Sequence, residues 1–138
     1  VCAANGPATD GEGEDYVVTL LDQLEYGDLP ESAVAAIDRC RQRGGRVVAV
    51  GTTSVRVLET VAAAGPIRPW SGATNLYIHP PYPFRAVDAL VTNFHLPRST
   101  LLLLVGALAG GELLQRAYAA AVAEKYHFYS YGDAMLIV

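Results

Sequence analysis

Residues 46–50 form a short apolar run that is preceded by Gly44 and Gly45 and followed by Gly51. A run without polar alternation is typical of a strand that is covered on both faces. The next residues, TTSVRVLET (52–60), open with three hydroxyl side chains and continue with apolar residues at helical spacing. A buried strand that turns directly into a helix favours the α/β class of domain.

Strand and helix patterns alternate along the chain. Helices are expected from residues 30–32 to 44–45, over 55–64, from 97–101 to 109 and over 112–125. Strands are expected over 15–25, 46–50, 75–78, 86–92 and 134–138, with a turn at 27–30 and a loop at 67–74. Because the connections are too short for a large antiparallel sheet, the predicted fold class is α/β, with a partial, mostly parallel sheet and helices alternating along the chain.

Length and composition limit the chain to one domain. It has 138 residues, of which 51% are hydrophobic and 17% are charged, and this is enough for a packed core. Residues 1–14 mix Gly, Ala and acids without a period, so we expect a flexible lead there and a single α/β domain over residues 15–138. The helix expected at 101–109 is almost wholly apolar and should therefore be buried.

The formal net charge of -4 disfavours nucleic-acid binding by this chain alone, since nucleic-acid-binding domains usually carry a basic stripe. Arg39, Arg41, Arg43 and Arg46 form a mild basic cluster. This cluster either contacts phosphates or is a solvated helix face. A nucleic-acid partner would need further contacts from elsewhere.

Cys2 and Cys40 are far apart and have no neighbouring Cys or His at metal-ligand spacing. We therefore expect neither a disulfide nor a metal site, and a reducing, cytoplasmic location. The longest uncharged apolar stretch, residues 99–111, has 13 residues, fewer than the ~20 that cross a bilayer. No membrane contact is expected, and no targeting signal is recognisable at the start.

The turn GTTS (51–54) is the first candidate site. In parallel α/β sheets, ligands gather at the carboxyl ends of strands, where helix N-termini attract carboxylates and phosphates. The ligand-binding candidates are the hydroxyl residues and the cation of the first helical turn: Thr52, Thr53, Ser54 and Arg56. The alternative is that a hydroxyl only caps the helix and that Arg56 pairs on the surface with Glu59.

A second candidate site follows the strand expected at 86–92, whose carboxyl end carries Asn93 and His95. Histidine can act as an acid, a base or a hydrogen-bond donor near neutral pH, so His95 is a candidate catalytic residue and Asn93 a ligand-binding candidate. Ser99 and Thr100 are helix caps first and ligand-binding candidates second. The alternative is a structural histidine, with Asn93 shaping a turn.

The third candidate site is YHFYSYGDAML (126–136), where four aromatic residues and a histidine precede Gly132 and Asp133. Aromatic faces could stack a purine, which makes Tyr131 a ligand-binding candidate. Asp133 could anchor a ribose hydroxyl or an amine and is the other candidate catalytic residue. The alternative is that the aromatic run is core. The motifs GxGxxG, GxxxxGK[ST], GxSxG and HExxH are absent from the sequence.

Three blocks together resemble the S-adenosylmethionine:tRNA ribosyltransferase-isomerase family of queuosine biosynthesis: VVAVGTTSVRVLET (47–60), VDALVTNFHLPRSTLLLLVGALAGGE (87–112) and YHFYSYGDAML (126–136). The string TNFHLPRSTL is the most specific and the GTTS turn is the least. The resemblance spans about residues 25–136 and corresponds to the C-terminal third or so of a family member. It implies part of a barrel-like α/β domain whose first strands are missing, so apolar edges would need a partner chain or a homo-oligomer.

The resemblance also implies a reaction. The family transfers and isomerises the ribosyl moiety of S-adenosylmethionine, a co-substrate, onto the 7-aminomethyl-7-deazaguanine wobble base of tRNA. A sulfonium acidifies the neighbouring C–H, so that a positioned base can remove the proton, adenine can leave, and methionine can depart when the epoxide closes. An anion-binding helix start would suit the methionine carboxylate, and aromatic residues would suit adenine.

Two features depart from the family pattern. The family typically has His-x-x-His before the segment that matches residues 25–30, whereas this chain has Leu20 and Gln23. A family glycine is replaced by Pro81. These changes favour a divergent paralogue or one half of a split enzyme. The alternatives are a non-catalytic domain that binds a ligand or a partner, and an enzyme that acts on a small molecule.

Overall fold

The structure is a computed structural model that describes residues 24–130 and 132–138. The predicted flexible lead at 1–14 and almost all of the strand predicted at 15–25 lie outside the described residues. In chain order the elements are β1 (Glu25–Leu29), α1 (Glu31–Gln42), β2 (Val48–Val50), α2 (Thr52–Ala63), β3 (Trp70–Thr74), β4 (Ala89–Asn93), α3 (Thr100–Ala109), α4 (Gly111–Ala123) and β5 (Ala134–Ile137). The prediction of an α/β fold is confirmed.

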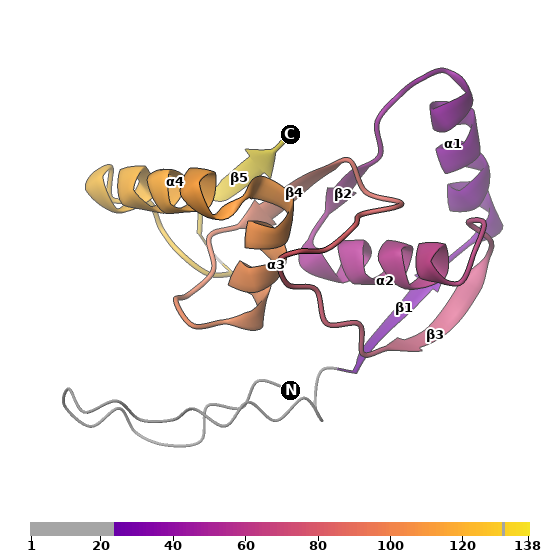
Figure 1. Cartoon of the computed structure of the whole chain (residues 1–138), viewed down its shortest axis with the longest axis horizontal. Helices are drawn as coiled ribbons and strands as arrows, with labels where there is room; N and C mark the ends of the chain where they lie inside the picture. The colour runs from indigo at the N-terminus through magenta and orange to yellow at the C-terminus, as the bar shows by residue number, and fades with distance from the viewer. Residues whose placement is uncertain (1–23, 131) are drawn as a thin grey trace.

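The larger sheet has three strands in the order β2-β4-β5 (Figure 1). β2 runs parallel to β4, and Val50 lies opposite Val91. β5 runs antiparallel to β4, and Leu136 lies opposite the same Val91. The smaller sheet pairs β1 with β3, also antiparallel. The prediction of a mostly parallel sheet is therefore wrong for the described residues, because only one of their three strand pairings is parallel.

The connection after β4 explains why β5 is antiparallel. A single crossover helix carries the chain back to the start of a strand, so the next strand runs parallel. Here two helices follow β4, and α3 and α4 are bent by 116° to each other. The chain leaves the end of β4 and returns to that end, where Asn93 pairs with Ala134. Among the described residues no single helix has the length and hydropathy of a membrane span. Only α3 and α4 taken together have that length and hydropathy, and the bend separates them.

The strands of the smaller sheet were not predicted, because turn-forming residues lie within one of them. Gly27 and Asp28 predict a turn, yet they lie within β1 and pair with β3 from Glu25 opposite Thr74 to Leu29 opposite Trp70. Gly27 packs so tightly on α2 that a β-carbon there would collide with Val57, so tertiary packing outweighs turn propensity. The strand predicted at 75–78 is likewise wrong, because the ladder ends at Thr74, and the loop predicted at 67–74 is confirmed only for residues 67–69.

The positions where helices begin depend on backbone conformation as well as on the spacing of apolar residues. α1 begins at Glu31, as predicted. α2 begins at Thr52, earlier than the start predicted at residue 55, because Gly51 adopts a φ of 86° and turns the chain directly from β2 into the helix. α3 is only half-buried: Leu104 and Val105 are in the core, whereas Leu103 is 41% exposed. The prediction of a fully buried helix at 101–109 is therefore wrong.

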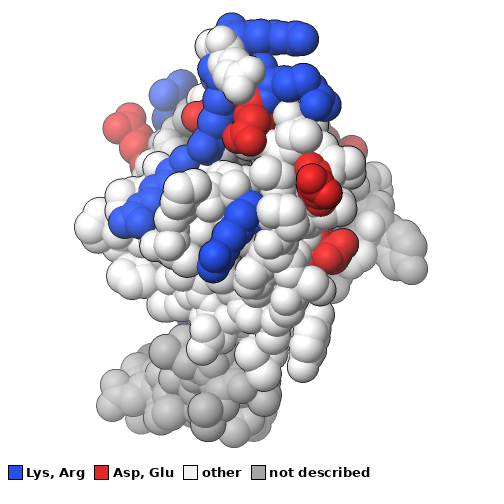
Figure 2. All heavy atoms as spheres, turned by 90° about the vertical axis from the view of Figure 1, so that its right-hand side faces the viewer, with Lys and Arg blue, Asp and Glu red and all other residues white. Residues whose placement is uncertain are grey.

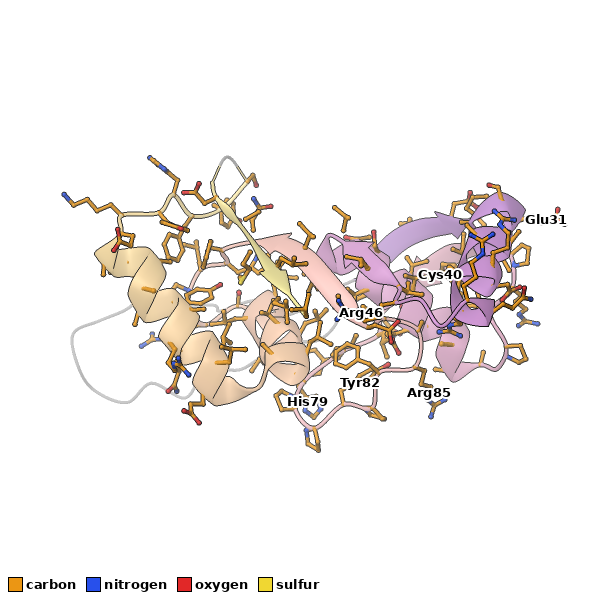
Figure 3. All side chains as sticks on the ribbon, turned by 90° about the horizontal axis from the view of Figure 1, so that it is seen from above. Glu31, Cys40, Arg46, His79, Tyr82 and Arg85 are labelled. Carbon is orange, nitrogen blue, oxygen red and sulfur yellow. The ribbon has the colours of Figure 1, made fainter. Side chains whose placement is uncertain are left out.

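The core lies on one side of the larger sheet. Ala49, Leu90 and Ile137 lie side by side on β2, β4 and β5 and are buried against apolar residues of α2 and α3. The opposite face carries Val48, Val50, Val91 and Leu136, and also Ala89, which lies opposite Val48 and is fully buried. No helix crosses in front of β4 and β5 when this side is viewed from above (Figure 3).

We call these four residues the open sheet face: Val48, Val50, Val91 and Leu136. Val50 is 69% exposed and Leu136 is 61% exposed, and Val91 between them is partly buried. The prediction that the strand at 46–50 is covered on both faces is therefore wrong within the described residues. Strands of parallel pairs are usually covered on both sides, so this face lacks a layer that such a sheet normally has.

Candidate functional site

The parallel pairing of β2 and β4 brings the first two candidate sites to one edge of the sheet. The N–H of Gly51 donates a hydrogen bond to the Val91 carbonyl at 2.8 Å. The GTTS turn therefore begins beside the point where β4 reaches Thr92 and Asn93. Because parallel strands end on the same side of a sheet, the starts of α2 and of the turn after β4 lie next to each other.

The hydroxyl residues of the first turn of α2 differ in their surroundings. Thr52 is buried, whereas Thr53 and Ser54 are exposed. Ser54 donates its hydroxyl proton to the Val50 carbonyl at 2.8 Å, and no side chain caps the helix. The alternative that a hydroxyl caps α2 is therefore wrong. Thr53 and Ser54 also line a mostly apolar cavity of about 470 Å³ between α1, α2, β1 and β2.

Arg56 lies in the interior rather than at the mouth of this edge. Its side chain is 4% exposed, its Nη1 lies 2.8 Å from Glu25 Oε1, and its Nε donates to the Leu76 carbonyl at 3.0 Å. The alternative that Arg56 pairs with Glu59 on the surface is wrong, since its carboxylate partner is on β1. Arg56 thus links α2 to β1 and to the segment that follows β3. Binding of a ligand carboxylate by Arg56 stays a prediction.

His95 is held from two sides at the carboxyl end of β4. Its Nε2 lies 3.0 Å from Thr92 Oγ1, and its backbone N–H donates to the Tyr118 hydroxyl of α4 at 2.8 Å. His95 is 9% exposed and Thr92 is 6% exposed. Burial lowers the pKa of His95, because a charged imidazole would lose hydration there. A neutral imidazole at neutral pH is the form that can accept a proton.

The third candidate site folds back onto the second. Asn93 donates from Nδ2 to the Gly132 carbonyl at 3.4 Å, and the Phe94 N–H donates to the Asp133 carbonyl at 3.4 Å. Asp133 Oδ2 accepts from the His127 N–H at 2.8 Å and lies 3.6 Å from His127 Nδ1. Asp133 is thus tied to its own loop, with a half-exposed carboxylate, at the same edge as Asn93.

The described aromatic residues of the run pack around Phe94 but stay partly or largely exposed. Phe94 contacts Tyr118, Tyr126 and Phe128, with ring centroids 5.3, 5.6 and 5.4 Å apart. These rings fasten the loop at 126–133 to β4 and α4. The alternative that the run is core is not borne out in the described residues, because Tyr126 is 47% exposed, Tyr129 is 60% exposed and Phe128 is only partly buried. Tyr131 lies outside the described residues.

The chain matches a protein-family model over all the elements that form this edge of the sheet. The model is described as "Queuosine biosynthesis protein" and matches residues 15–137. The chain belongs to this queuosine biosynthesis family.

Similar relatives carry the name S-adenosylmethionine:tRNA ribosyltransferase-isomerase. The protein from Parvibaculum lavamentivorans is 60% identical over 82% of this chain, that from Symbiobacterium thermophilum 60% over 92%, and that from Thiobacillus denitrificans 61% over 95%. These matches cover 33%, 37% and 37% of the relatives, so the chain spans about a third of their length.

A solved structure shows a similar fold. The crystal structure of S-adenosylmethionine tRNA ribosyltransferase from Thermotoga maritima superposes with a TM-score of 0.78 at 52% identity. It covers 82% of this chain and 40% of that chain. The arrangement of helices and strands is therefore that of part of a queuosine-family protein.

A second cavity lies at the start of α3 in this family member. It measures about 390 Å³ and is lined by apolar residues of α3 and α4 and by Tyr77, Arg98, Ser99 and Thr100, among others. Ser99 caps α3, since its hydroxyl accepts from the Leu102 N–H at 3.3 Å, as predicted. Thr100 is buried. Of the described ligand-binding candidates, Thr52, Thr53, Ser54 and Asn93 lie at the sheet edge, Ser99 and Thr100 line this cavity, and Arg56 lies in the interior.

Reasoning from the sequence missed three residues that shape the site. Tyr118 and Thr92 hold His95, and Glu59 on α2 is wholly buried. The Glu59 carboxylate accepts hydrogen bonds from the backbone N–H groups of three consecutive residues: Arg85, Ala86 and Val87. Thr92 lies only three residues before His95, so a local pattern could have indicated this contact, whereas Tyr118 is 23 residues away and the partners of Glu59 are distant backbone groups.

Proposed function

We propose that this chain is part of an S-adenosylmethionine:tRNA ribosyltransferase-isomerase and acts together with the rest of the family fold. The complete enzyme transfers and isomerises the ribosyl moiety of S-adenosylmethionine onto the 7-aminomethyl-7-deazaguanine wobble base of tRNA, which gives epoxyqueuosine. The support is that relatives of this name are 60–61% identical over 82–95% of the chain. S-adenosylmethionine is the co-substrate, and the predicted absence of a metal stays a prediction.

The single observation that carries the proposal is the meeting of three sequence blocks at one edge of the sheet. Gly51 bonds to β4, Asn93 bonds to Gly132, and Phe94 bonds to Asp133. The candidate catalytic residues are His95 and Asp133. The ligand-binding candidates are Thr52, Thr53, Ser54, Arg56, Asn93, Ser99, Thr100 and Tyr131.

The proposed chemistry assigns His95 the role of the base. A neutral imidazole takes a proton from the carbon next to the sulfonium, whose positive charge stabilises the electron pair left on that carbon. The amine of the wobble base replaces adenine at the ribose carbon and gives up a proton, while adenine leaves with the electron pair of its C–N bond and takes up a proton. The electron pair of the deprotonated carbon then forms a bond to the same ribose carbon, whose bond to the ring oxygen breaks. The freed oxygen closes the epoxide on the carbon that carried the sulfur, and methionine departs with the C–S electron pair. Asp133, whose carboxylate is half-exposed, anchors a hydroxyl or an amine.

The open sheet face is proposed to pack against the part of the family fold that this chain does not span. Val48, Val50, Val91 and Leu136 form an apolar strip on the less covered side of the larger sheet. The relatives are nearly three times as long as the matched segment, so they contain the residues that can supply the missing layer. A complete, barrel-like α/β domain belongs to that assembly, in which residues 15–138 are one unit.

Transfer RNA is proposed as a partner of the assembly rather than of this chain alone. The net charge is -4, yet Arg39, Arg43 and Arg46 are exposed at the end of α1 and after it. Figure 2 shows Lys and Arg side chains gathering at this end of the molecule. Such a cluster suits phosphate contacts that add to those of the remaining fold. A cytoplasmic location is part of the same proposal.

Calorimetric titration with S-adenosylmethionine tests the proposal, first with this chain and then with an equimolar complement fragment. The complement fragment is the part of the Thiobacillus denitrificans relative outside its match to this chain. Release of adenine and methionine is then measured with tRNA that carries or lacks the modified base. We expect release only with the modified tRNA and the complement fragment. No heat and no release at millimolar S-adenosylmethionine, in a mixture that assembles, would refute the proposal.

Val50→Asp tests the open sheet face, and Val122→Asp on α4 is the matched control because Val122 is 66% exposed. A charge buried in an apolar interface costs several kcal/mol, so Val50→Asp should abolish co-elution with the complement fragment. Val122→Asp should leave co-elution intact. A homodimer that Val50→Asp breaks, without binding of the complement fragment, would show instead that a second copy covers the face.

A non-catalytic binding domain is the second candidate function. The observation that favours it is Leu20 and Gln23, where the family typically has two histidines. Binding of S-adenosylmethionine without release of adenine, in the presence of the complement fragment and modified tRNA, would support this function over the first. An enzyme that acts on a small molecule instead would release adenine without any tRNA.

A further inference from the structure

His95 is fixed through two atoms, and its partners come from two different elements. The backbone N–H is held by the Tyr118 hydroxyl at 2.8 Å, and the ring is held at Nε2 by Thr92 Oγ1 at 3.0 Å. Because the two contacts lie on either side of the Cα–Cβ bond, they restrict both the backbone and the rotation of the ring. With only one of these contacts, either the backbone or the rotation of the ring would be unrestricted.

Both partners are themselves rigid. Thr92 is a β-branched residue within β4 and is 6% exposed, so its hydroxyl has little freedom of rotation about χ1. Tyr118 packs against Phe94 and Phe128, with ring centroids 5.3 and 5.8 Å away. Its hydroxyl is therefore held in place by an aromatic cluster that also includes the residue next to His95.

The contact at Nε2 determines which ring nitrogen is left for chemistry. A neutral imidazole has one donor nitrogen and one acceptor nitrogen, so the direction of the hydrogen bond at one of them sets the role of the other, and the Thr92 hydroxyl can donate or accept. Within residues 24–130 and 132–138, Thr92 is the only hydrogen-bond partner of the His95 ring, and Nδ1 has none. Nδ1 is therefore the nitrogen that can meet a substrate.

We infer that Thr92 is a positioning residue that fixes the tautomer and orientation of His95, so that Nδ1 is the nitrogen that exchanges a proton with the substrate. This rests on the proposed function, in which His95 is the base. As a base, Nδ1 needs its lone pair free, and this requires the Nε2 proton to point at Thr92 Oγ1. The threonine hydroxyl then accepts, the ring keeps its proton on Nε2, and the substrate proton goes to Nδ1 to give an imidazolium.

Nitrogen-15 NMR of the imidazole rings tests the inference without any turnover. The chain has three histidines, so His79→Gln and His127→Gln variants assign the signals. We expect His95 at pH 7.5 to be a single neutral tautomer with its proton on Nε2. Thr92→Val, which keeps the shape and removes the hydroxyl, should give a mixture of tautomers, and Thr92→Ser should restore the single form. A spectrum that Thr92→Val leaves unchanged, or a proton found on Nδ1, would overturn the inference.

Kinetics in the presence of the complement fragment provide the second readout. Misplacement of a base lowers kcat, so Thr92→Val should reduce the kcat of adenine release by about 10- to 100-fold, with KM for S-adenosylmethionine almost unchanged. Thr92→Ser should recover most of the rate. Thr74→Val is the matched control, because Thr74 is a 3% exposed threonine on β3, away from His95. Equal losses of rate in Thr74→Val and Thr92→Val would reduce the role of Thr92 to packing.

The two readouts separate this inference from the proposed function. If no adenine is released by the wild-type mixture, the proposed function fails while the tautomer still reports on Thr92. If adenine is released and Thr92→Val changes neither the tautomer nor kcat, the proposed function holds and this inference fails.

Discussion

Two clusters of buried polar residues in this protein differ in how completely their polar atoms are hydrogen-bonded. On α2, Glu59 and Arg56 have partners at most of their polar atoms: Glu59 binds three backbone N–H groups, and Arg56 binds Glu25 and the Leu76 carbonyl. At the end of β4, and counting only the residues that the structure describes, His95 has one partner for its ring, and Asn93 has one long hydrogen bond of 3.4 Å to Gly132.

The difference separates polar groups that stabilise the fold from those with capacity left for a ligand. A buried charge is tolerated when hydrogen bonds and an opposite charge compensate it, and once compensated it has little left to offer a substrate. The cluster on α2 joins β1 and the segment 76–87 to the helix. In the cluster at the end of β4, the Nδ1 atom of His95 has no hydrogen-bond partner among the described residues. We therefore expect substitutions on α2 to change stability and substitutions at β4 to change chemistry.

The largest effect on stability is expected from Glu59→Gln. The amide has one acceptor oxygen and brings two N–H donors toward backbone donors of residues 85–87, so at least one buried N–H loses its partner. The free energy of unfolding should fall by roughly 3–5 kcal/mol. Urea denaturation measures it, and Glu112→Gln on the exposed start of α4 is the matched control, with an expected change of about 0.5 kcal/mol. A loss below that of the control would contradict the structural role of Glu59.

Local patterns in the sequence predicted the parts of this fold that local forces decide. The β2 strand and the α1, α3 and α4 helices follow from apolar runs, caps and glycines near each element. The direction of β5 depends on the bend between α3 and α4, and the β1 strand depends on contact between Gly27 and Val57. Neither is encoded within a short window of sequence.

The candidate site shows the same division. Asn93 and His95 could be placed at a strand end because the apolar run of β4 stops there. The internal partner of Arg56 could not be predicted, since Glu25 is distant in sequence and joins it only through the β1–β3 sheet. Tyr118 was missed for the same reason, because its hydroxyl reaches His95 only after α4 folds back over β4.

Arg56→Met should have the second-largest effect on stability. It keeps much of the side-chain volume but leaves the Glu25 carboxylate and the Leu76 carbonyl without their partner. We expect a loss of about 2–4 kcal/mol in the free energy of unfolding, against less than about 0.5 kcal/mol for Arg116→Met on the exposed side of α4. Urea denaturation gives the stability, and calorimetry below the melting temperature gives the affinity for S-adenosylmethionine.

The affinity of the Arg56→Met variant for S-adenosylmethionine shows whether Arg56 stabilises the fold or binds the ligand. A structural Arg56 predicts that the folded variant binds S-adenosylmethionine as the wild type does. A loss of affinity of about 1.5–3 kcal/mol, the range for a charged hydrogen bond, would place Arg56 in the ligand site and break the contrast between α2 and β4.

The smallest effect is expected from the titration of His95. Burial holds its pKa below the usual value of 6.5, so the unfolded chain binds the proton more readily than the folded chain does. This contribution to stability is therefore fully present above pH 6.5 and is lost as the pH falls below it toward the lowered pKa. We expect the melting temperature to decrease less between pH 7.5 and 5.5 in His95→Gln than in the wild type. An equal decrease in both would mean that His95 is hydrated like a surface residue, and the partly satisfied cluster at β4 would then not be a dry site for proton transfer.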